Sequence, residues 1–202
     1  MKNMEKLAVD IDGVLANFLQ AFLDFFNALK GTGYKEYHIC HWEFSKCFGI
    51  TKEEERRLLD NFYASGKLKQ LTCLPYAKEA IKELSKIYEI YALTSRHNSL
   101  YSDTIFWIRT HFPEIKDVFF LDKTRNSKEI ICREIGIKIL VEDNKDFAFK
   151  AAQNGIFVLL MDKPYNKGLE HDNIKRVEDW KAAKRLLIEL QKHKALKSIK
   201  II

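Results

Sequence analysis

Two aspartates, Asp10 and Asp12, follow a short apolar run in the segment "LAVDIDGVLANF", residues 7–18. Side chains two residues apart along a strand lie on the same side, and Gly13 allows the backbone to turn tightly beside whatever they hold. Two carboxylates this close repel each other unless one is protonated or a cation lies between them. Oxygen ligands, with Asp143 as a third carboxylate, are typical of Mg²⁺ sites. The segment therefore predicts a divalent metal site.

Covalent phosphoryl transfer would give the two aspartates different tasks. One carboxylate attacks phosphorus, while the other gives a proton to the leaving oxygen and later deprotonates the water that breaks the aspartyl phosphate. The phosphoryl oxygens need fixed donors, and the segment "LTSR" offers Thr94, Ser95 and nearby backbone N–H groups. A lysine would complete this set of phosphate ligands. Lys128, at a predicted helix start, is the first candidate and Lys123 is the alternative.

The elements that must position these residues are five short apolar runs separated by helical patterns. The runs span residues 6–12, 88–95, 117–122, 137–143 and 156–162, and the helical patterns span residues 77–87, 100–111, 127–135, 145–154 and 177–192. Nearly continuous apolar runs are typical of strands buried on both faces of a parallel sheet. The alternation predicts an α/β fold, a Rossmann-like three-layer sandwich with a central parallel sheet. Polar residues at the strand ends should then meet in one crevice.

Residues 17–72 contain no convincing buried strand and show helical periodicity rich in aromatic residues. An all-helical insertion after the first strand is the simplest account. The chain is thus expected to divide into a core, residues 1–16 and 73–202, and a helical unit, residues 17–72. Its aromatic residues are expected mainly to form the core of that unit.

Four motifs in this order resemble those of the haloacid dehalogenase (HAD) superfamily of phosphatases. They are "DIDGV" (10–14), "LTS" (93–95), a lysine before the next strand and "VEDN" (141–144). The resemblance implies Asp10 as nucleophile and Asp12 as general acid and base. It also implies Mg²⁺ bound by the Asp10 carboxylate, the Asp12 backbone carbonyl and Asp143. The second aspartate favours phosphoryl transfer over dehalogenation, whose enzymes lack it.

Within that superfamily the chain is similar to the 5′(3′)-deoxyribonucleotidase group, the cytosolic type C 5′-nucleotidases. "DIDGVLANF" resembles the group's "DVDGVLADF", and "DKPYNK" (162–167) and "IKRVEDW" (174–180) resemble its closing segments. The resemblance implies that residues 17–72 form a cap over the active site and that Phe18 contacts the substrate base. It implies a phosphoric monoester hydrolase, a 5′-nucleotidase that dephosphorylates deoxyribo- or ribonucleoside monophosphates.

Departures from the group's pattern leave alternatives open. The group carries a lysine in a K-x-x-W arrangement where this chain has Thr104, which transfers the lysine role to Lys128. Glu142 and Asn144 also depart from the group's D-D-R, and Asn17 stands where the group has an aspartate. The alternatives are a HAD phosphatase for another small phosphometabolite, a phosphomutase, a polynucleotide phosphatase, and a non-catalytic binding protein. Arg96 is expected to meet a phosphate or a base, or to pair with an acidic neighbour.

Composition narrows the class of partner. The net charge of +6 comes from 34 basic and 28 acidic residues that are mostly interspersed, so a nucleic-acid partner is not expected. The one concentrated basic stretch, residues 192–200, has no aromatic residues for stacking and is expected to be a solvated terminus. Residues 13–23, the longest uncharged segment near the start, are shorter than the ~20 residues of a membrane span. We expect a cytoplasmic protein without a membrane partner, and the sequence is compatible with a homodimer.

The four cysteines form no C-x-x-C pair and are expected to be free thiols. The histidines and cysteines of the segment "HICHWEFSKC", residues 38–47, could alternatively bind zinc, but no second pair of cysteines or histidines with the spacing of zinc ligands supports such a site.

Overall fold

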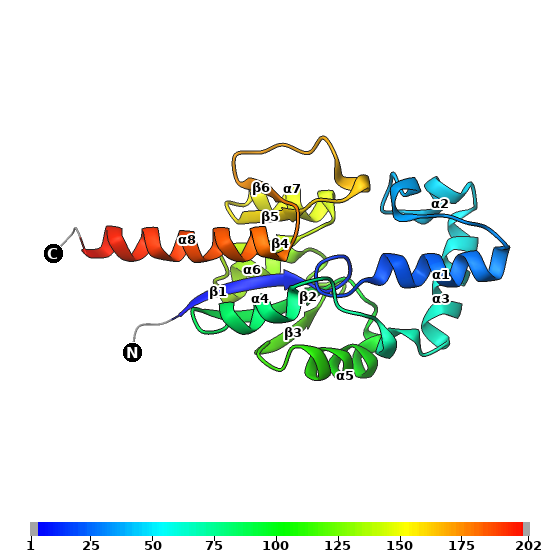
Figure 1. Ribbon diagram of the computed structural model, residues 1–202, viewed down its shortest axis with the longest axis horizontal. Helices are drawn as coiled ribbons and strands as arrows, with labels where there is room; N and C mark the ends of the chain where they lie inside the picture. The colour runs from blue at the N-terminus through cyan, green and yellow to red at the C-terminus, as the bar shows by residue number, and fades with distance from the viewer. Residues whose placement is uncertain (1–3, 200–202) are drawn as a thin grey trace.

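The structure, a computed structural model, describes residues 4–199 of the chain, with side chains to residue 193. Within this part the strands form one parallel sheet in the order β3-β2-β1-β4-β5-β6 (Figure 1). The strands are β1 (Glu5–Asp10), β2 (Tyr88–Thr94), β3 (Asp117–Phe120), β4 (Ile139–Glu142), β5 (Phe157–Met161) and β6 (Ile174–Val177). The predicted α/β fold with a central parallel sheet is confirmed.

Strand β1 lies at the point where the strand order reverses. The chain runs from β1 to β2 and β3 on one side, and then returns to place β4 on the other side of β1. Asp10 pairs in register with Leu93 of β2, and Val9 pairs with Val141 of β4. The polar residues that follow these three strands therefore emerge together, at the position where open α/β sheets bind their ligands.

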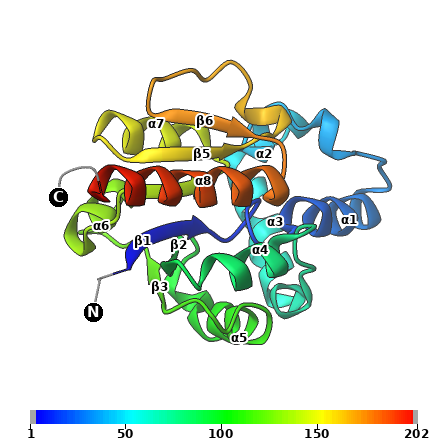
Figure 2. The ribbon, with the colours of Figure 1, turned by 60° about the vertical axis from the view of Figure 1, so that its left-hand side comes forward.

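Helices cover both faces of the sheet, as Figure 2 shows. The helices are α4 (Ala77–Leu84), α5 (Tyr101–His111), α6 (Lys128–Ile135), α7 (Lys145–Gln153) and α8 (Trp180–Ile199). Alternate residues of β1 point to opposite faces, so Leu7 and Val9 join a cluster with α4, α5 and α8, whereas Ala8 joins one with α6 and α7. Burial on both faces explains why the central strands are continuously apolar.

The sequence patterns missed β6 at the edge of the sheet. Only Val177 of this strand is fully buried, so the strand lacks the apolar run that marks the others. The predicted helix 177–192 therefore begins too early, because Val177 ends β6 and α8 starts at Trp180. The side chains of the basic stretch 192–200 lie outside the described residues after His193.

Residues 17–72 contain helices and no strand, and they lie beyond the carboxyl ends of the strands (Figure 1). The elements are α1 (Phe18–Lys30), η1 (Glu36–His38), α2 (Phe44–Phe48), α3 (Lys52–Ala64) and η2 (Lys67–Gln70). Phe22 of α1 is buried, and its ring centroid lies 4.5 Å from that of Phe44 and 5.7 Å from that of Phe62. Aromatic packing thus holds the three helices of this helical insertion together.

Two adjacent stretches of chain join the helical insertion to the rest of the molecule. The N–H of Asn17 donates to the carbonyl of Thr72 at 2.9 Å, and the N–H of Leu74 donates to the carbonyl of Leu15 at 2.8 Å. Ala16 and Cys73 form the antiparallel bridge between these bonds. The two crossings therefore lie side by side as a short paired ribbon. Among the helices that the structure describes, none combines the length and the apolar character needed to cross a membrane.

Candidate active site

A tight loop follows β1 and brings Asp10 and Asp12 to one cavity. The N–H of Leu15 donates to the carbonyl of Ile11 at 2.8 Å, which closes the loop. Gly13 has a φ of +80°, and a β-carbon built on it would lie 1.9 Å from Oδ2 of Asp143. Only glycine therefore allows the loop to approach the end of β4 this closely.

Three buried carboxyl groups meet at this point: Asp10, Glu142 and Asp143. Their oxygen atoms lie within 4.8 Å of one another, and among the described residues no other such group of three or more acidic, histidine or cysteine ligands is found. Nζ of Lys128 lies 2.6 Å from Oδ1 of Asp10 and 2.6 Å from Oε2 of Glu142. We call these three carboxyl groups the acidic cluster, and Lys128 is the cation that contacts it directly within the part of the chain that the structure describes.

The electrostatics of the acidic cluster indicate an excess of negative charge. Burial raises the pKa of Asp10 to about 7 against the opposing effect of Lys128, and Glu142 adds to the rise. Burial also raises the pKa of Asp143 well above its ordinary value, reinforced by Glu142 and Asp10. Burial alone would lower the pKa of Lys128, but Asp10 and Glu142 outweigh it and keep this side chain protonated. One ammonium thus faces three carboxyl groups, a donor set that suits a hard divalent cation.

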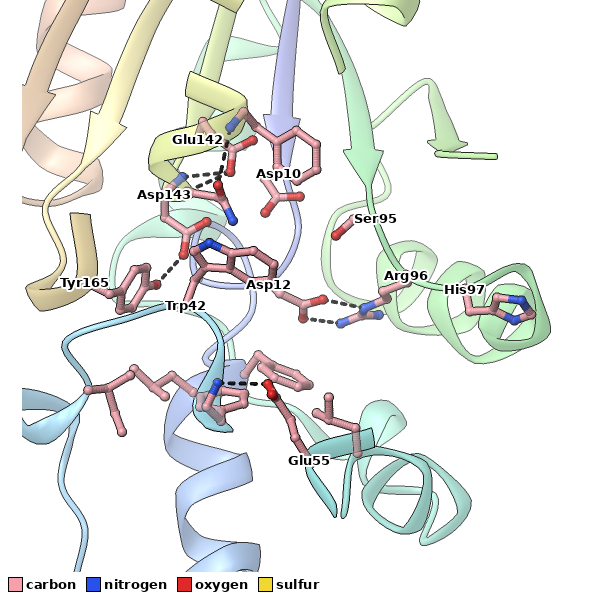
Figure 3. Close-up of a pocket in the computed structure, with 18 of the residues that line it drawn as sticks. Asp10, Asp12, Trp42, Glu55, Ser95, Arg96, His97, Glu142, Asp143 and Tyr165 are labelled. Carbon is pink, nitrogen blue, oxygen red and sulfur yellow. Dashed lines mark hydrogen bonds and ion pairs between the residues drawn. The ribbon is translucent and has the colours of Figure 1, made fainter. Parts of the chain in front are cut away.

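The acidic cluster is braced by hydrogen bonds from neighbouring groups. Oε1 of Glu142 accepts hydrogen bonds from the backbone N–H groups of Asp143 at 3.0 Å and Asn144 at 2.9 Å. The hydroxyl of Tyr165 donates to Oδ2 of Asp143 (Figure 3). Glu142 is therefore bonded through both oxygens, one to the backbone and one to Lys128, which leaves Asp10 and Asp143 as the carboxylates better placed for a cation.

Asp12 has a different partner. Nε of Arg96 donates to its Oδ2 at 2.8 Å and Nη2 donates to its Oδ1 at 2.6 Å, as the dashed lines in Figure 3 show. The guanidinium also donates from Nη1 to the hydroxyl of Thr104 at 3.2 Å. Of the two sequence interpretations of Arg96, pairing with an acidic neighbour is the one present in the structure. Thr104, where the nucleotidase resemblance has a lysine, is buried and supports Arg96 instead.

The cavity has a volume of about 410 Å³, and its two walls come from different parts of the chain. The carboxyl ends of the strands and the loops that follow them supply the acidic cluster, Asp12 and Ser95, and the first residue of α6 supplies Lys128. The helical insertion supplies the opposite wall, which contains Phe18, Leu19, Ile39, Trp42, Phe44, Glu55, Arg56, Leu59, Asp60 and Tyr63. A charged floor thus faces a largely apolar and aromatic roof, a combination typical of small-molecule sites.

Most of the residues predicted for the site line this cavity, including Asp10, Asp12, Phe18, Ser95, Arg96, Lys128 and Asp143. Thr94 is not among the lining residues, because it is buried and its hydroxyl accepts a hydrogen bond from the N–H of Arg96 at 3.1 Å. Lys123 is exposed and outside the lining, whereas Lys128 reaches Asp10. Of the two lysine candidates, the structure therefore places Lys128 at the site.

Trp42 and Tyr165 line the cavity and had no predicted role. Nε1 of Trp42 donates to Oδ2 of Asp146 on α7 at 3.0 Å, which links the helical insertion to the core. A second link joins Nζ of Lys163 to Oε1 of Glu36 at 3.2 Å. Tyr165 lies in "DKPYNK", whose resemblance to a closing segment of the nucleotidase group was the one available signal.

The segment 38–47 does not assemble a zinc site among the described residues. The sulfurs of Cys40 and Cys47 lie 3.7 Å apart. His41 instead accepts a hydrogen bond at Nδ1 from the N–H of Glu43 at 3.0 Å, and its Nε2 lies 3.1 Å from Nζ of Lys46. The cysteines are free thiols, as expected.

The chain is similar in sequence to known nucleotidases. The family model described as "5′ nucleotidase, deoxy (Pyrimidine), cytosolic type C protein" matches residues 3–194. A nucleotidase of Clostridium acetobutylicum is 25% identical over 183 residues, 88% of this chain and 91% of that protein. A 5′(3′)-deoxyribonucleotidase of Bacillus subtilis is 23% identical over 189 residues, 90% of this chain and 98% of that protein.

Solved structures share the fold. A haloacid dehalogenase-like hydrolase from Streptococcus pneumoniae has a TM-score of 0.62 at 16% identity, covering 80% of this chain and 86% of that chain. A HAD hydrolase from Bacillus subtilis, solved bound to magnesium, has a TM-score of 0.61 at 14% identity, covering 92% and 99% of the two chains.

Proposed function

The chain belongs to the family of cytosolic type C 5′-nucleotidases within the HAD superfamily, and from that membership we propose that it hydrolyses nucleoside monophosphates, deoxy or ribo, through an aspartyl phosphate. As a member of this family it is a phosphomonoester hydrolase. One observation carries the finer proposal. Asp10, Asp12 and Lys128 meet the aromatic side chains of the helical insertion in a single cavity.

Asp10 is the nucleophile in this proposal. An oxygen of its carboxylate attacks phosphorus, a P–O bond to Asp10 forms, and the P–O bond to the nucleoside breaks. Lys128, 2.6 Å from Oδ1, fixes the orientation of the carboxylate and offers positive charge to the phosphoryl oxygens. Ser95, which lines the same floor, is a further phosphate ligand. The buried hydroxyl of Thr94 instead supports the loop that carries Ser95, because it accepts a hydrogen bond from the N–H of Arg96.

Asp12 transfers the protons. The reaction starts from the form in which the carboxyl group of Asp12 carries a proton, and Asp12 donates this proton to the leaving nucleoside oxygen as the first P–O bond breaks. The resulting carboxylate then takes a proton from the water that attacks phosphorus, and the P–O bond to Asp10 breaks to release inorganic phosphate. Both aspartates thereby return to their starting state.

Asp10, Asp143 and the backbone carbonyl of Asp12 are the proposed ligands of Mg²⁺. The surplus negative charge of the acidic cluster supports this assignment, and Glu142 is left out because both of its oxygens are already bonded. When bound, the ion supplies charge that stabilises the phosphoryl oxygens. Within the protein, Tyr165 orients Asp143 through its hydrogen bond.

The helical insertion acts as a cap that binds the nucleoside. Phe18, Trp42 and Tyr63 face the cavity and offer flat apolar surfaces on which a base can stack. The roof also carries Arg56 and Asp60, whose polar groups can distinguish one base edge from another. Phe18 packs edge-on against Phe62 with ring centroids 5.4 Å apart, so its ring is held in place before substrate arrives.

The test is a panel of phosphate esters presented to the purified protein with Mg²⁺, with phosphate release as the readout. Deoxyribo- and ribonucleoside 5′- and 3′-monophosphates are compared with sugar phosphates. We expect nucleotides to give the highest kcat/KM, and faster turnover of sugar phosphates would reject the nucleotide assignment. Asp10→Asn should abolish turnover and the acid-stable radiolabel left by ³²P-labelled substrate, and retained activity would reject the covalent step.

A further inference from the structure

We propose that Arg96 is a positioning residue for proton transfer, which holds the carboxylate of Asp12 towards the leaving oxygen and does not bind the substrate. The inference rests on the proposed function, because it assigns a task to a neighbour of the proton-transferring aspartate. It differs from the expectation that Arg96 meets a phosphate or a base.

Two hydrogen bonds from Arg96 fix the orientation of the Asp12 carboxylate. Two nitrogens of one guanidinium donate to two oxygens of one carboxylate, at 2.8 Å and 2.6 Å. Such a pair is planar and allows little rotation of either group. The side chain of Asp12 is 27% exposed and faces the cavity, whereas that of Arg96 is 2% exposed. Both residues line the cavity, and the aspartate is the more accessible of the two.

Arg96 is itself anchored to the core. Its Nη1 donates to the hydroxyl of Thr104, which is fully buried on α5, and its backbone N–H donates to the hydroxyl of Thr94. Burial alone would lower the pKa of Arg96, but Asp12 more than offsets this effect and keeps the guanidinium charged. A chain of contacts thus runs from α5 through Arg96 to the group that moves the proton.

Most donors of Arg96 are used within the protein. Of its five N–H groups, one on Nε and one on Nη2 donate to Asp12, and one on Nη1 donates to Thr104. A phosphate that took over the Nε and Nη2 donors would displace Asp12, which would remove the proton donor from the leaving oxygen. Holding Asp12 in place is therefore the role that the geometry supports.

The role predicts a dependence on the leaving group. A nucleoside alkoxide is a strong base and needs a proton as its P–O bond breaks, whereas 4-nitrophenolate is a weak base and leaves without one. Misplacing the acid should then slow release of a nucleoside far more than release of 4-nitrophenol. A defect of folding or of phosphate binding would slow both to the same extent.

The experiment measures the first turnover of a nucleotide and of 4-nitrophenyl phosphate by rapid quench, in Mg²⁺, with Arg96→Lys and Thr104→Val. Arg96→Lys keeps the charge but cannot make the planar pair, and we expect about 100-fold slower nucleoside release. Release of 4-nitrophenol in the first turnover should change by less than about threefold, because that step needs no acid. Thr104→Val removes one hydrogen bond from the charged guanidinium and should slow nucleoside release by about threefold to tenfold, again with less effect on 4-nitrophenol. Arg57→Lys, an exposed arginine of α3 outside the cavity lining, is the matched control.

Three outcomes would overturn the inference. They are equal losses with both esters, a raised KM for the nucleotide with unchanged kcat, and unaltered nucleoside release in Arg96→Lys. Should the wild-type protein hydrolyse no nucleotide, the proposed substrate is wrong, and the comparison is made with whichever alkyl phosphate it does hydrolyse. Thr104→Val changes no charge, so it still tests the inference if Arg96→Lys fails to fold.

Discussion

Gly13 and Asp143 touch across the floor of the cavity, since a β-carbon on Gly13 would lie 1.9 Å from a carboxylate oxygen of Asp143. We expect Gly13→Ala to displace that carboxylate and to reduce kcat by at least about 100-fold, as misplaced catalytic groups do. Gly31→Ala is the matched control, because Gly31 has a similar positive φ of +65° with nothing within 4 Å. Both variants carry the backbone strain, so full activity of Gly13→Ala would show that the contact is unimportant.

Tyr165 should control the affinity for Mg²⁺ through Asp143. Its hydroxyl donates to Oδ2 of Asp143, and partners of this kind typically change metal affinity by about 10- to 100-fold when removed. We expect Tyr165→Phe to raise the Mg²⁺ concentration that gives half-maximal activity by about tenfold, with kcat at saturating Mg²⁺ nearly restored. Tyr88→Phe removes another buried hydroxyl, bonded to the carbonyl of Leu187, and should leave the Mg²⁺ titration unchanged.

Metal and pH should affect thermal stability together. Burial raises the pKa of Asp10 from 3.8 to about 7, so the folded state holds this proton more tightly than the unfolded state. The contribution of Asp10 therefore favours the fold below pH ~4 and is lost as the pH rises towards about 7. We expect the Tm of the protein in EDTA to fall between about pH 4 and about pH 7. Mg²⁺ should restore the Tm at the higher pH and have little effect at the lower one.

Asp10→Asn tests whether Asp10 causes the dependence of the Tm on pH and on Mg²⁺. The amide cannot titrate and is a poorer ligand for a hard cation, so the fall in Tm with pH should flatten and the Mg²⁺ shift should shrink. A Tm in EDTA that rises over this pH range would contradict the electrostatic description of the acidic cluster.

Trp42 should affect substrate binding more than the chemical step. Its indole N–H is bonded to Asp146 at 3.0 Å, which holds the ring over the cavity. We expect Trp42→Phe to raise KM for the nucleotide by about threefold to tenfold, the effect of one lost hydrogen bond, with kcat nearly unchanged. Tyr37→Phe, at an exposed position of the helical insertion, is the control. A fall in kcat at constant KM would assign Trp42 to the chemistry instead.

Much of the fold and part of the site could be predicted from the sequence because they depend on local patterns. The central strands are buried on both faces and therefore read as apolar runs, whereas β6 at the edge does not. Asp10, Asp12 and Asp143 stand at strand ends, and the parallel topology brings such ends together. The type and position of each residue were sufficient to predict these features.

The remaining site depends on contacts that no local pattern encodes. Arg96, which pairs with Asp12, also donates to the buried hydroxyl of Thr104, and Tyr165 reaches Asp143 from a turn 22 residues further along the chain. Thr94 and Ser95 were both predicted to bind phosphate, but the hydroxyl of Thr94 is buried, accepts a hydrogen bond from the Arg96 N–H and does not line the cavity. Each of these outcomes is set by tertiary packing.

The paired ribbon formed by residues 15–17 and 72–74 is the place where the covalent links of the helical insertion meet. Any swing of the roof away from the floor must therefore turn on this ribbon as on a hinge. The Trp42–Asp146 hydrogen bond and the Glu36–Lys163 ion pair join the roof to the core, and both would break in such a movement. Asp12 lies only four residues before the ribbon partner Ala16, so the hinge and the proton-transferring group belong to the same loop.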